Sequence, residues 1–145
     1  MKLSTRTRYG IRAAIELAGR YGQGPVQIKV IAEKQAISVK YLEQLTAMLK
    51  SGGCVQSIRG SKGGYVLGRA PEDIKLDELF LSLEGSITTA EYVEGKSYCA
   101  RAADCVVREV WMQVQEAVMN VLRSFTLKDL AEKAKIRHDT LNYQI

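Results

Sequence analysis

The stretch that decides the fold is I-A-E-K-Q-A-I-S-V-K-Y-L-E-Q-L-T-A-M-L-K-S-G-G-C-V-Q-S-I-R-G-S-K-G-G-Y-V-L, residues 31–67. Apolar residues recur at helical spacing on both sides of the short turn A-I-S, which predicts one helix over about residues 27–35 and another over 39–51. Ser38 is a good N-cap for the second of these helices, and the glycine pair that begins at Gly52 ends it. This pattern predicts a helix-turn-helix, in which the turn aims the following helix at the major groove of DNA.

Two short runs with β-type patterning, residues 54–58 and 64–67, follow that helix directly. Between them stands R-G-S-K-G, residues 59–63, which is rich in glycine and basic, so we expect a hairpin. An arginine at such a tip commonly enters a narrow, electronegative minor groove, and the glycines let backbone approach backbone. An ordinary turn with chance charges is the alternative, but the position directly after the helix favours a wing that carries Arg59 and Lys62.

The rest of the chain is mostly helical in pattern. Apolar spacing predicts further helices over residues 5–21, about 76–83, about 105–125, and a short last helix that Thr126 caps with Asp129 as its reciprocal partner. Residues 84–104 have weak periodicity and are expected to form a loop. The polar tail after Ile136 is expected to be loose.

Charge divides the chain into two unlike halves. Residues 1–70 hold 12 Lys/Arg and 3 Asp/Glu, whereas residues 71–145 hold 9 Lys/Arg and 13 Asp/Glu. A basic half joined to an acidic half is typical of a polyanion binder with a separate second module. We therefore predict a mainly α fold with a small β-hairpin wing, divided into a winged helix-turn-helix DNA-binding domain (1–70), a connecting helix with a cysteine-containing sensor loop (71–104), and a dimerisation helix with a short last helix and tail (105–145).

Several other classes of protein are disfavoured. No run approaches the ~20 apolar residues that span a bilayer, and no apolar stretch follows the N-terminal charges, so we expect a cytoplasmic protein without a membrane partner. The sequence offers no acid–base pair, no nucleophile with a histidine and no phosphate-binding loop, so we expect no enzyme.

The side chains expected to contact DNA lie on the helix over 39–51 and on the wing. Gln44 can pair with adenine and Glu43 can accept from cytosine, while Lys40 and Tyr41 suit phosphates or guanine. A merely solvated helix face is the alternative. The predicted contact set is Lys2, Ser38, Lys40, Tyr41, Glu43, Gln44, Arg59, Ser61 and Lys62.

Four segments resemble one known family. M-K-L-S-T-R-T-R-Y-G, I-A-E-K-Q-A-I-S-V-K-Y-L-E-Q-L, S-I-R-G-S-K-G-G-Y-V-L and T-L-K-D-L-A are similar to the bacterial winged-helix repressors that include IscR, NsrR and CymR, over residues 1 to about 135. The resemblance implies a homodimer held by the long C-terminal helix and bound to imperfect palindromes upstream of genes. It also implies base contacts from the third helix and a minor-groove contact from Arg59.

The cysteines bear on what such a regulator would sense. IscR-like members hold a [2Fe-2S] cluster with three cysteines and a histidine, and the resemblance places Cys99 and Cys105 on the second and third of those cysteines. Val93 and Arg108 stand where the other two ligands would be, so a cluster is short of ligands. The candidates to complete it are Glu91, Glu94, Asp104 or a residue of the other subunit.

Two alternatives to a cluster stay open for these cysteines: a reversible disulfide or thiol switch, and no function. Cys54 is expected to be a buried small hydrophobe. We therefore predict a homodimeric repressor that responds to iron–sulfur cluster status or thiol redox state and controls genes of iron–sulfur cluster biogenesis.

The C-terminal residues N-Y-Q-I resemble the tails of serine acetyltransferases and of CymR-like repressors. That resemblance implies cysteine synthase as a partner that Ile145 would engage. The alternative function is therefore a CymR-like repressor of cysteine metabolism with cysteine synthase as corepressor. An incidental tail is the other interpretation of these four residues.

Overall fold

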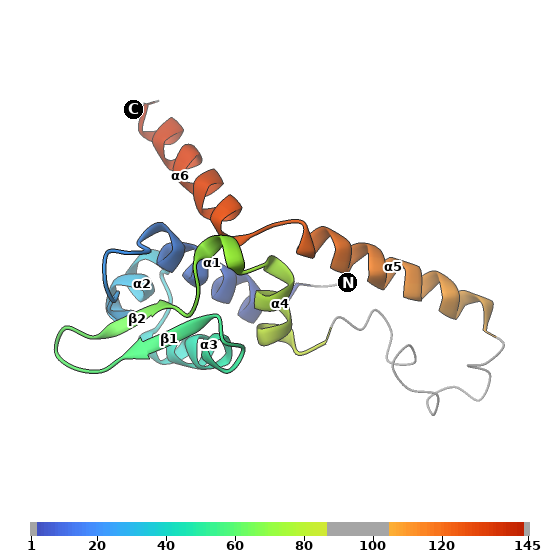
Figure 1. The fold of residues 1–145 in the computed structure, drawn as a ribbon, viewed down its shortest axis with the longest axis horizontal. Coiled ribbons are helices and arrows are strands. Elements are labelled where there is room, and N and C mark those ends of the chain that lie inside the picture. The colour runs from blue at the N-terminus through green and yellow to red at the C-terminus, as the bar shows by residue number, and fades with distance from the viewer. Residues whose placement is uncertain (1–2, 87–104, 144–145) are drawn as a thin grey trace.

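The computed structural model describes residues 3–86 and 105–143 (Figure 1). The elements in chain order are α1 (Thr5–Gly19), α2 (Ile28–Gln35), α3 (Val39–Ser51), β1 (Val55–Ile58), β2 (Gly64–Leu67), the 3-10 turn η1 (Pro71–Asp73), α4 (Leu76–Glu84), α5 (Val106–Arg123) and α6 (Leu127–Tyr143). The predicted fold class is confirmed: the chain is mainly helical, with one antiparallel hairpin that follows the helix-turn-helix. No helix in these two ranges is long and apolar enough to cross a membrane.

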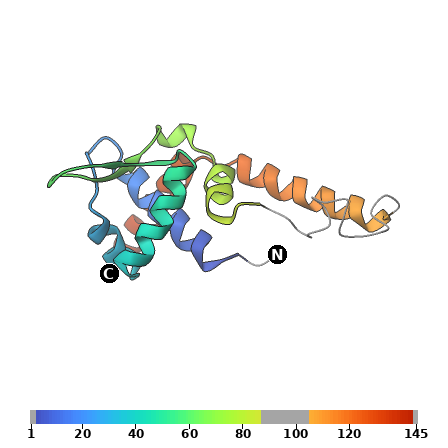
Figure 2. The same cartoon turned by 90° about the horizontal axis from the view of Figure 1, so that it is seen from below.

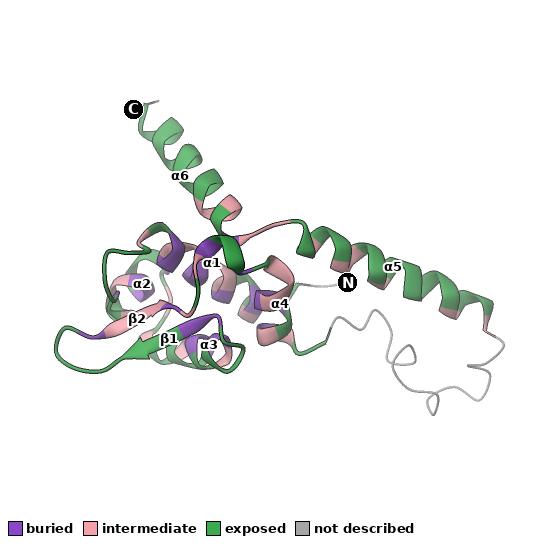
Figure 3. Cartoon of the chain, viewed as in Figure 1, coloured by how far each residue is buried: buried purple, intermediate pink, exposed green. Residues whose placement is uncertain are grey.

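The hydrophobic core lies between α1, α2, α3, the hairpin and α4 (Figure 3). Leu42, Leu45 and Leu49 lie three and four residues apart on α3 and are all fully buried. Burying each such side chain stabilises the fold by roughly 1.5–3 kcal/mol. The core also continues past residue 70, because it takes in Ile74, Leu79, Leu83 and Leu127.

Close packing sets the distance between α1 and α4. A Cβ atom added at Gly10 would lie only 2.6 Å from Cδ1 of Leu83. Glycine at this position therefore lets the last turn of α4 press against α1, and the fit fixes the register between the two helices.

Two local features shape the part of the chain that contains α3 and the hairpin. Ser38 caps α3, since its Oγ accepts a hydrogen bond from the Tyr41 N–H at 3.1 Å, as the sequence predicted. A contact that the sequence did not predict holds the root of the wing, where Val26 and Tyr65 exchange backbone hydrogen bonds of 2.9 and 2.8 Å. This bridge pairs Val26 with β2 as a one-residue third strand. It joins the hairpin to the segment before α2.

The C-terminal helices leave the core in different directions (Figure 1). Their junction is anchored, because the Leu76 N–H donates to the Phe125 carbonyl at 3.0 Å and the Leu127 N–H to the Ile74 carbonyl at 2.8 Å. The predicted capping box is present: the Thr126 N–H donates to Asp129 Oδ2 at 2.8 Å and the Asp129 N–H to Thr126 Oγ1 at 3.2 Å.

The prediction of a loose tail after Ile136 is wrong, because α6 continues to Tyr143. The capping box starts the helix, and residues 127–143 contain no glycine or proline that would interrupt it. The N-terminal part of α6 also packs against α1 and η1, which supplies tertiary support.

Candidate nucleic-acid interface

The polar face of α3 is open to solvent while its opposite face is fixed in the core. Ser38, Lys40, Glu43 and Gln44 are exposed, and Tyr41 is half-buried. In the view from below, α3 crosses in front of α1 and the hairpin extends beyond it (Figure 2). The predicted base-reading side chains therefore lie together on one accessible helix face of a rigid element.

The wing tip carries its charges outward. Arg59, Ser61 and Lys62 are exposed, and the tight turn is closed by a 3.0 Å hydrogen bond from the Gly63 N–H to the Gly60 carbonyl. Glycine is required at position 63, where a Cβ would lie 2.1 Å from the Ile58 carbonyl oxygen. The tip is therefore a compact backbone turn that presents two cations and a hydroxyl.

A side-chain contact joins α3 to the wing. Lys50 Nζ, in the last turn of α3, donates to Ser57 Oγ on β1 at 2.9 Å. The helix and the hairpin would thus meet a ligand as one unit.

The first helix adds basic residues that the sequence analysis missed. The rings of Tyr9 and Tyr41 meet edge to face with centroids 6.4 Å apart, and the Arg12 guanidinium lies 5.5 Å from the centre of the Tyr9 ring. Arg8 is four residues before Arg12 and shares its helix face. Both arginines are exposed, so α1 extends the basic surface beside the start of α3. The sequence indicated their exposure only through their positions, since both arginines lie outside the apolar stripe of α1.

The remaining predicted site residues are divided between the described and undescribed parts of the chain. Lys2, Cys99 and Ile145 lie outside the described residues. Cys105 is the N-cap residue of α5 and is half-buried. Cys54 is a fully buried small side chain, as predicted, and burial raises the pKa of its thiol against the lowering effect of the Ser82 hydroxyl.

The described thiols do not make up a cluster site. Of the cysteines in the two described ranges, Cys105 has a partly accessible thiol and Cys54 does not, and no group of three or more His, Cys, Asp and Glu side chains in those ranges could hold a metal ion. A [2Fe-2S] centre needs four ligands. The described residues therefore do not fit such a centre.

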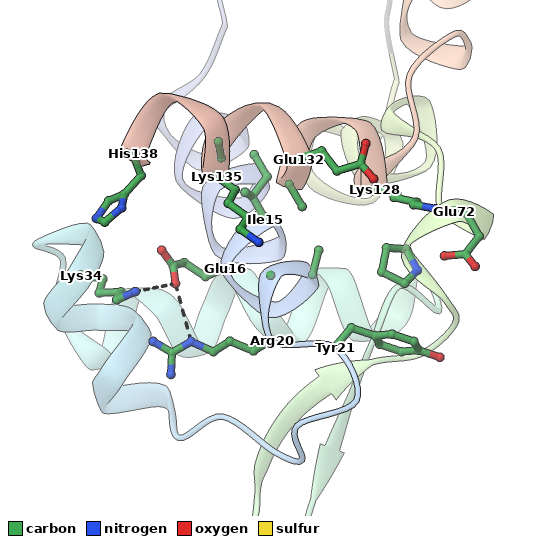
Figure 4. Close-up of a pocket in the computed structure, with 15 residues that line it drawn as sticks. Ile15, Glu16, Arg20, Tyr21, Lys34, Glu72, Lys128, Glu132, Lys135 and His138 are labelled. Atoms are coloured by element: carbon green, nitrogen blue, oxygen red, sulfur yellow. Dashed lines mark hydrogen bonds and ion pairs between the residues drawn. The ribbon is translucent and has the colours of Figure 1, made fainter. Parts of the chain in front are cut away.

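A separate groove of about 710 Å³ lies between α1, η1 and α6 (Figure 4). Glu16 on its wall pairs with Lys34 at 3.2 Å and with Arg20 at 3.9 Å. Glu132 and Lys135 of α6 add both signs of charge. Because acidic and basic side chains alternate there, the groove does not continue the basic surface of α1, α3 and the wing.

The family model "Rrf2: Iron-dependent Transcriptional regulator" matches residues 3–133. The chain belongs to the Rrf2 family. This Rrf2 protein is 44% identical over 131 residues to the HTH-type transcriptional regulator CymR of Bacillus subtilis (strain 168), with 90% of each chain covered. It is 32% identical to the HTH-type transcriptional regulator IscR of Erwinia tasmaniensis, with 94% of this chain and 82% of that protein covered.

Solved structures agree with the sequence comparison. CymR (YrzC), named as the global cysteine regulator of B. subtilis, matches with a TM-score of 0.76 and 42% identity over 92% of this chain and 98% of that chain. T. potens IscR matches with a TM-score of 0.75 and 40% identity over 92% and 88%. The predicted family and winged-helix fold are confirmed. The Rrf2 protein is a transcriptional regulator of a DNA-binding, commonly dimeric family, and its relatives are regulators rather than enzymes.

Proposed function

We propose that this Rrf2 protein is a homodimeric repressor that binds a palindromic operator, with α3 in the major groove and Arg59 of the wing in the minor groove. One observation carries the proposal: the polar side of α3, the wing tip and the arginines of α1 are exposed together, while the core holds α3 from behind. A major groove admits one helix, and its base edges distinguish all four base pairs. Gln44 and Glu43 are the proposed base-reading residues, and Lys40, Arg8 and Arg12 the proposed phosphate contacts.

The proposal of a dimer rests on α5. None of its 18 residues is buried. Its apolar stripe contains Val107, Val110, Trp111, Val114, Val118 and Val121. Val107, Val110 and Val121 are each more than half exposed, at 52%, 53% and 59%. A stripe at this spacing fits the same stripe of a second copy, and two-fold symmetry would place two reading surfaces on a palindrome.

We propose that Cys99 and Cys105 receive the signal. A thiol switch is favoured over a cluster, because two cysteines suffice for a disulfide, whereas a cluster needs four ligands and Val93 and Arg108 stand at two of those positions. Under this proposal the controlled genes belong to cysteine metabolism. The family description, which names iron, supports the [2Fe-2S] cluster and genes of cluster biogenesis as the second candidate. The cysteine synthase partner depends on Ile145 and remains a prediction from the tail alone.

The DNA-binding proposal can be tested with a duplex selected from a random library by the purified protein. Arg59→Ala should weaken binding to that duplex by ~1–3 kcal/mol, measured by fluorescence anisotropy, and wild-type binding should fall steeply with salt. Arg137→Ala, on the exposed part of α6, is the control and should bind as the wild type does. Selection of no duplex, or equal affinity of Arg59→Ala and wild type, would contradict the proposal.

The signal needs a second experiment. Protein purified without oxygen is assayed for iron and visible absorption, and then for operator affinity before and after diamide oxidation. Colourless protein whose affinity changes on oxidation, with the change lost in Cys99→Ala and Cys105→Ala, supports the thiol switch. Bound iron that both variants lose supports the cluster. If the protein contains no iron and its operator affinity does not change on oxidation, both the thiol switch and the cluster are excluded.

A further inference from the structure

The first turn of α1 has an incomplete cap of its own. Ser4 is the N-cap, and its Oγ accepts a hydrogen bond from the Thr7 N–H at 3.1 Å. In a complete capping box the third helical residue is Glu or Gln and accepts from the N-cap N–H, but here that residue is Thr7. No acidic residue stands in this turn, whereas Arg6 does, although the positive end of a helix dipole favours anions.

Glu84, the last residue of α4, supplies the missing acid from about eighty residues away. One oxygen of its carboxylate accepts from the hydroxyls of Ser4 and Thr7, and the other lies 3.5 Å from Arg6 Nη2. Burial alone would raise the pKa of Glu84, but the Ser4 and Thr7 hydroxyls, the Ser4 backbone N–H and the Arg6 charge together hold it below its usual value. The carboxylate therefore completes the cap of α1 in its ionised form.

The helix that this cap holds leads to the DNA-facing surface. Tyr9 is two positions beyond Thr7 and contacts Tyr41 in the first turn of α3, and Arg12 lies over the Tyr9 ring. Leu83, next to Glu84, fits against Gly10 on the same helix. Glu84 and Leu83 thus fix α1 in rotation and along its axis, and with it the direction in which Arg8 and Arg12 point.

We infer that Glu84 is a positioning residue for DNA binding, which orients the α1 arginines toward the phosphates beside the major groove. The inference rests on the proposed DNA-binding function. Glu84 itself contacts α1 and not the nucleic acid, so its effect is exerted through Ser4, Thr7 and the helix that they begin.

The test compares wild type, Glu84→Gln and the matched control Glu116→Gln, an exposed acid on α5, on the selected duplex over a range of salt. Glu84→Gln should bind the duplex about tenfold more weakly. The slope of log affinity against log salt concentration should become shallower by the equivalent of about one to two phosphate contacts, since Arg8 and Arg12 would no longer point at the phosphates. Thermal melting and sedimentation serve to check that the variant is a folded dimer. A merely structural role would lower the melting temperature and the active fraction without changing the slope.

Should Glu84→Gln melt below the assay temperature, Ser4→Ala takes its place, since it removes one of the two hydroxyls that contact Glu84, and the acceptor of the Thr7 N–H, while leaving the acid. It is expected to reduce the affinity and the slope in the same direction. A wild type that binds no duplex refutes the proposed function. A wild type that binds, with folded variants of equal affinity and slope, refutes the role of Glu84 alone.

Discussion

Helices α3 and α5 have similar amphipathic sequences but very different surroundings. On α3 the apolar stripe of Leu42, Leu45 and Leu49 is fully buried, whereas no residue of α5 is buried. Figure 3 shows this contrast, with purple confined to the body and α5 drawn in green and pink. Hydrophobic spacing therefore predicts a helix and its inner face, but not which chain supplies the surface that covers that face.

The largest expected effect comes from placing charge in the α5 stripe. Val107→Glu combined with Val114→Glu should give a folded monomer, because two like charges would then face the second copy in an apolar interface. Operator affinity should fall by about 100-fold or more as the second reading surface is lost. Sedimentation equilibrium and anisotropy measure the two effects.

Gln113→Glu is the control for this variant, since it lies outside the stripe, and it should remain dimeric. A Val107→Glu, Val114→Glu protein that stays dimeric would show that α5 is covered by something other than a second copy.

Truncating one residue in each apolar stripe should separate a buried face from an interface between chains. Leu42→Ala should lower the free energy of unfolding by ~2–5 kcal/mol at every protein concentration, because it leaves a cavity inside one chain. Val114→Ala should lower the free energy of unfolding only at protein concentrations at which the dimer forms. Urea denaturation at two protein concentrations separates these cases, and a concentration-independent loss for Val114→Ala would speak against its place in an interface.

The sequence predicted the local part of this structure well. Periodicity and caps located α3, the hairpin, the Ser38 cap and the Thr126–Asp129 box, since each depends on neighbours within a few residues. The full length of α6 was missed because its polar composition suggested a tail, although helix propensity and packing on α1 favour a helix.

The features that the sequence could not reveal join distant segments. The Val26–Tyr65 bridge, the Tyr9–Tyr41 contact and the cap from Glu84 have no signature at any fixed spacing. For the candidate site, this means that α3 and the wing could be predicted, whereas the contribution of α1 could not. The Cys99 part of the predicted sensor lies outside the described residues and remains a prediction.

The smallest expected effect is a pH dependence at Glu84. Its folded pKa lies below the ordinary value of 4.5, so the ionised carboxylate stabilises the fold above that value and this stabilisation is lost as pH falls through the lower, folded pKa. The difference in unfolding free energy between wild type and Glu84→Gln should therefore be about 1 kcal/mol at pH 7, typical of a lost cap, and shrink below pH 4.5. Urea titrations at pH 7 and at acid pH measure it, and a difference that grows on acidification would reverse the assigned sign.

The cap at Glu84 also has a consequence for how the chain is made. Helix α1 is synthesised first, but its N-terminal cap needs Glu84 and the core around it needs Leu127. A nascent chain that has reached residue 70 holds all of α1, α2, α3 and the wing, yet lacks the carboxylate and three of the leucines that complete them. We therefore expect residues 1–70 to fold late during synthesis on the ribosome. A gene fragment that ends at residue 70 should yield an unfolded product.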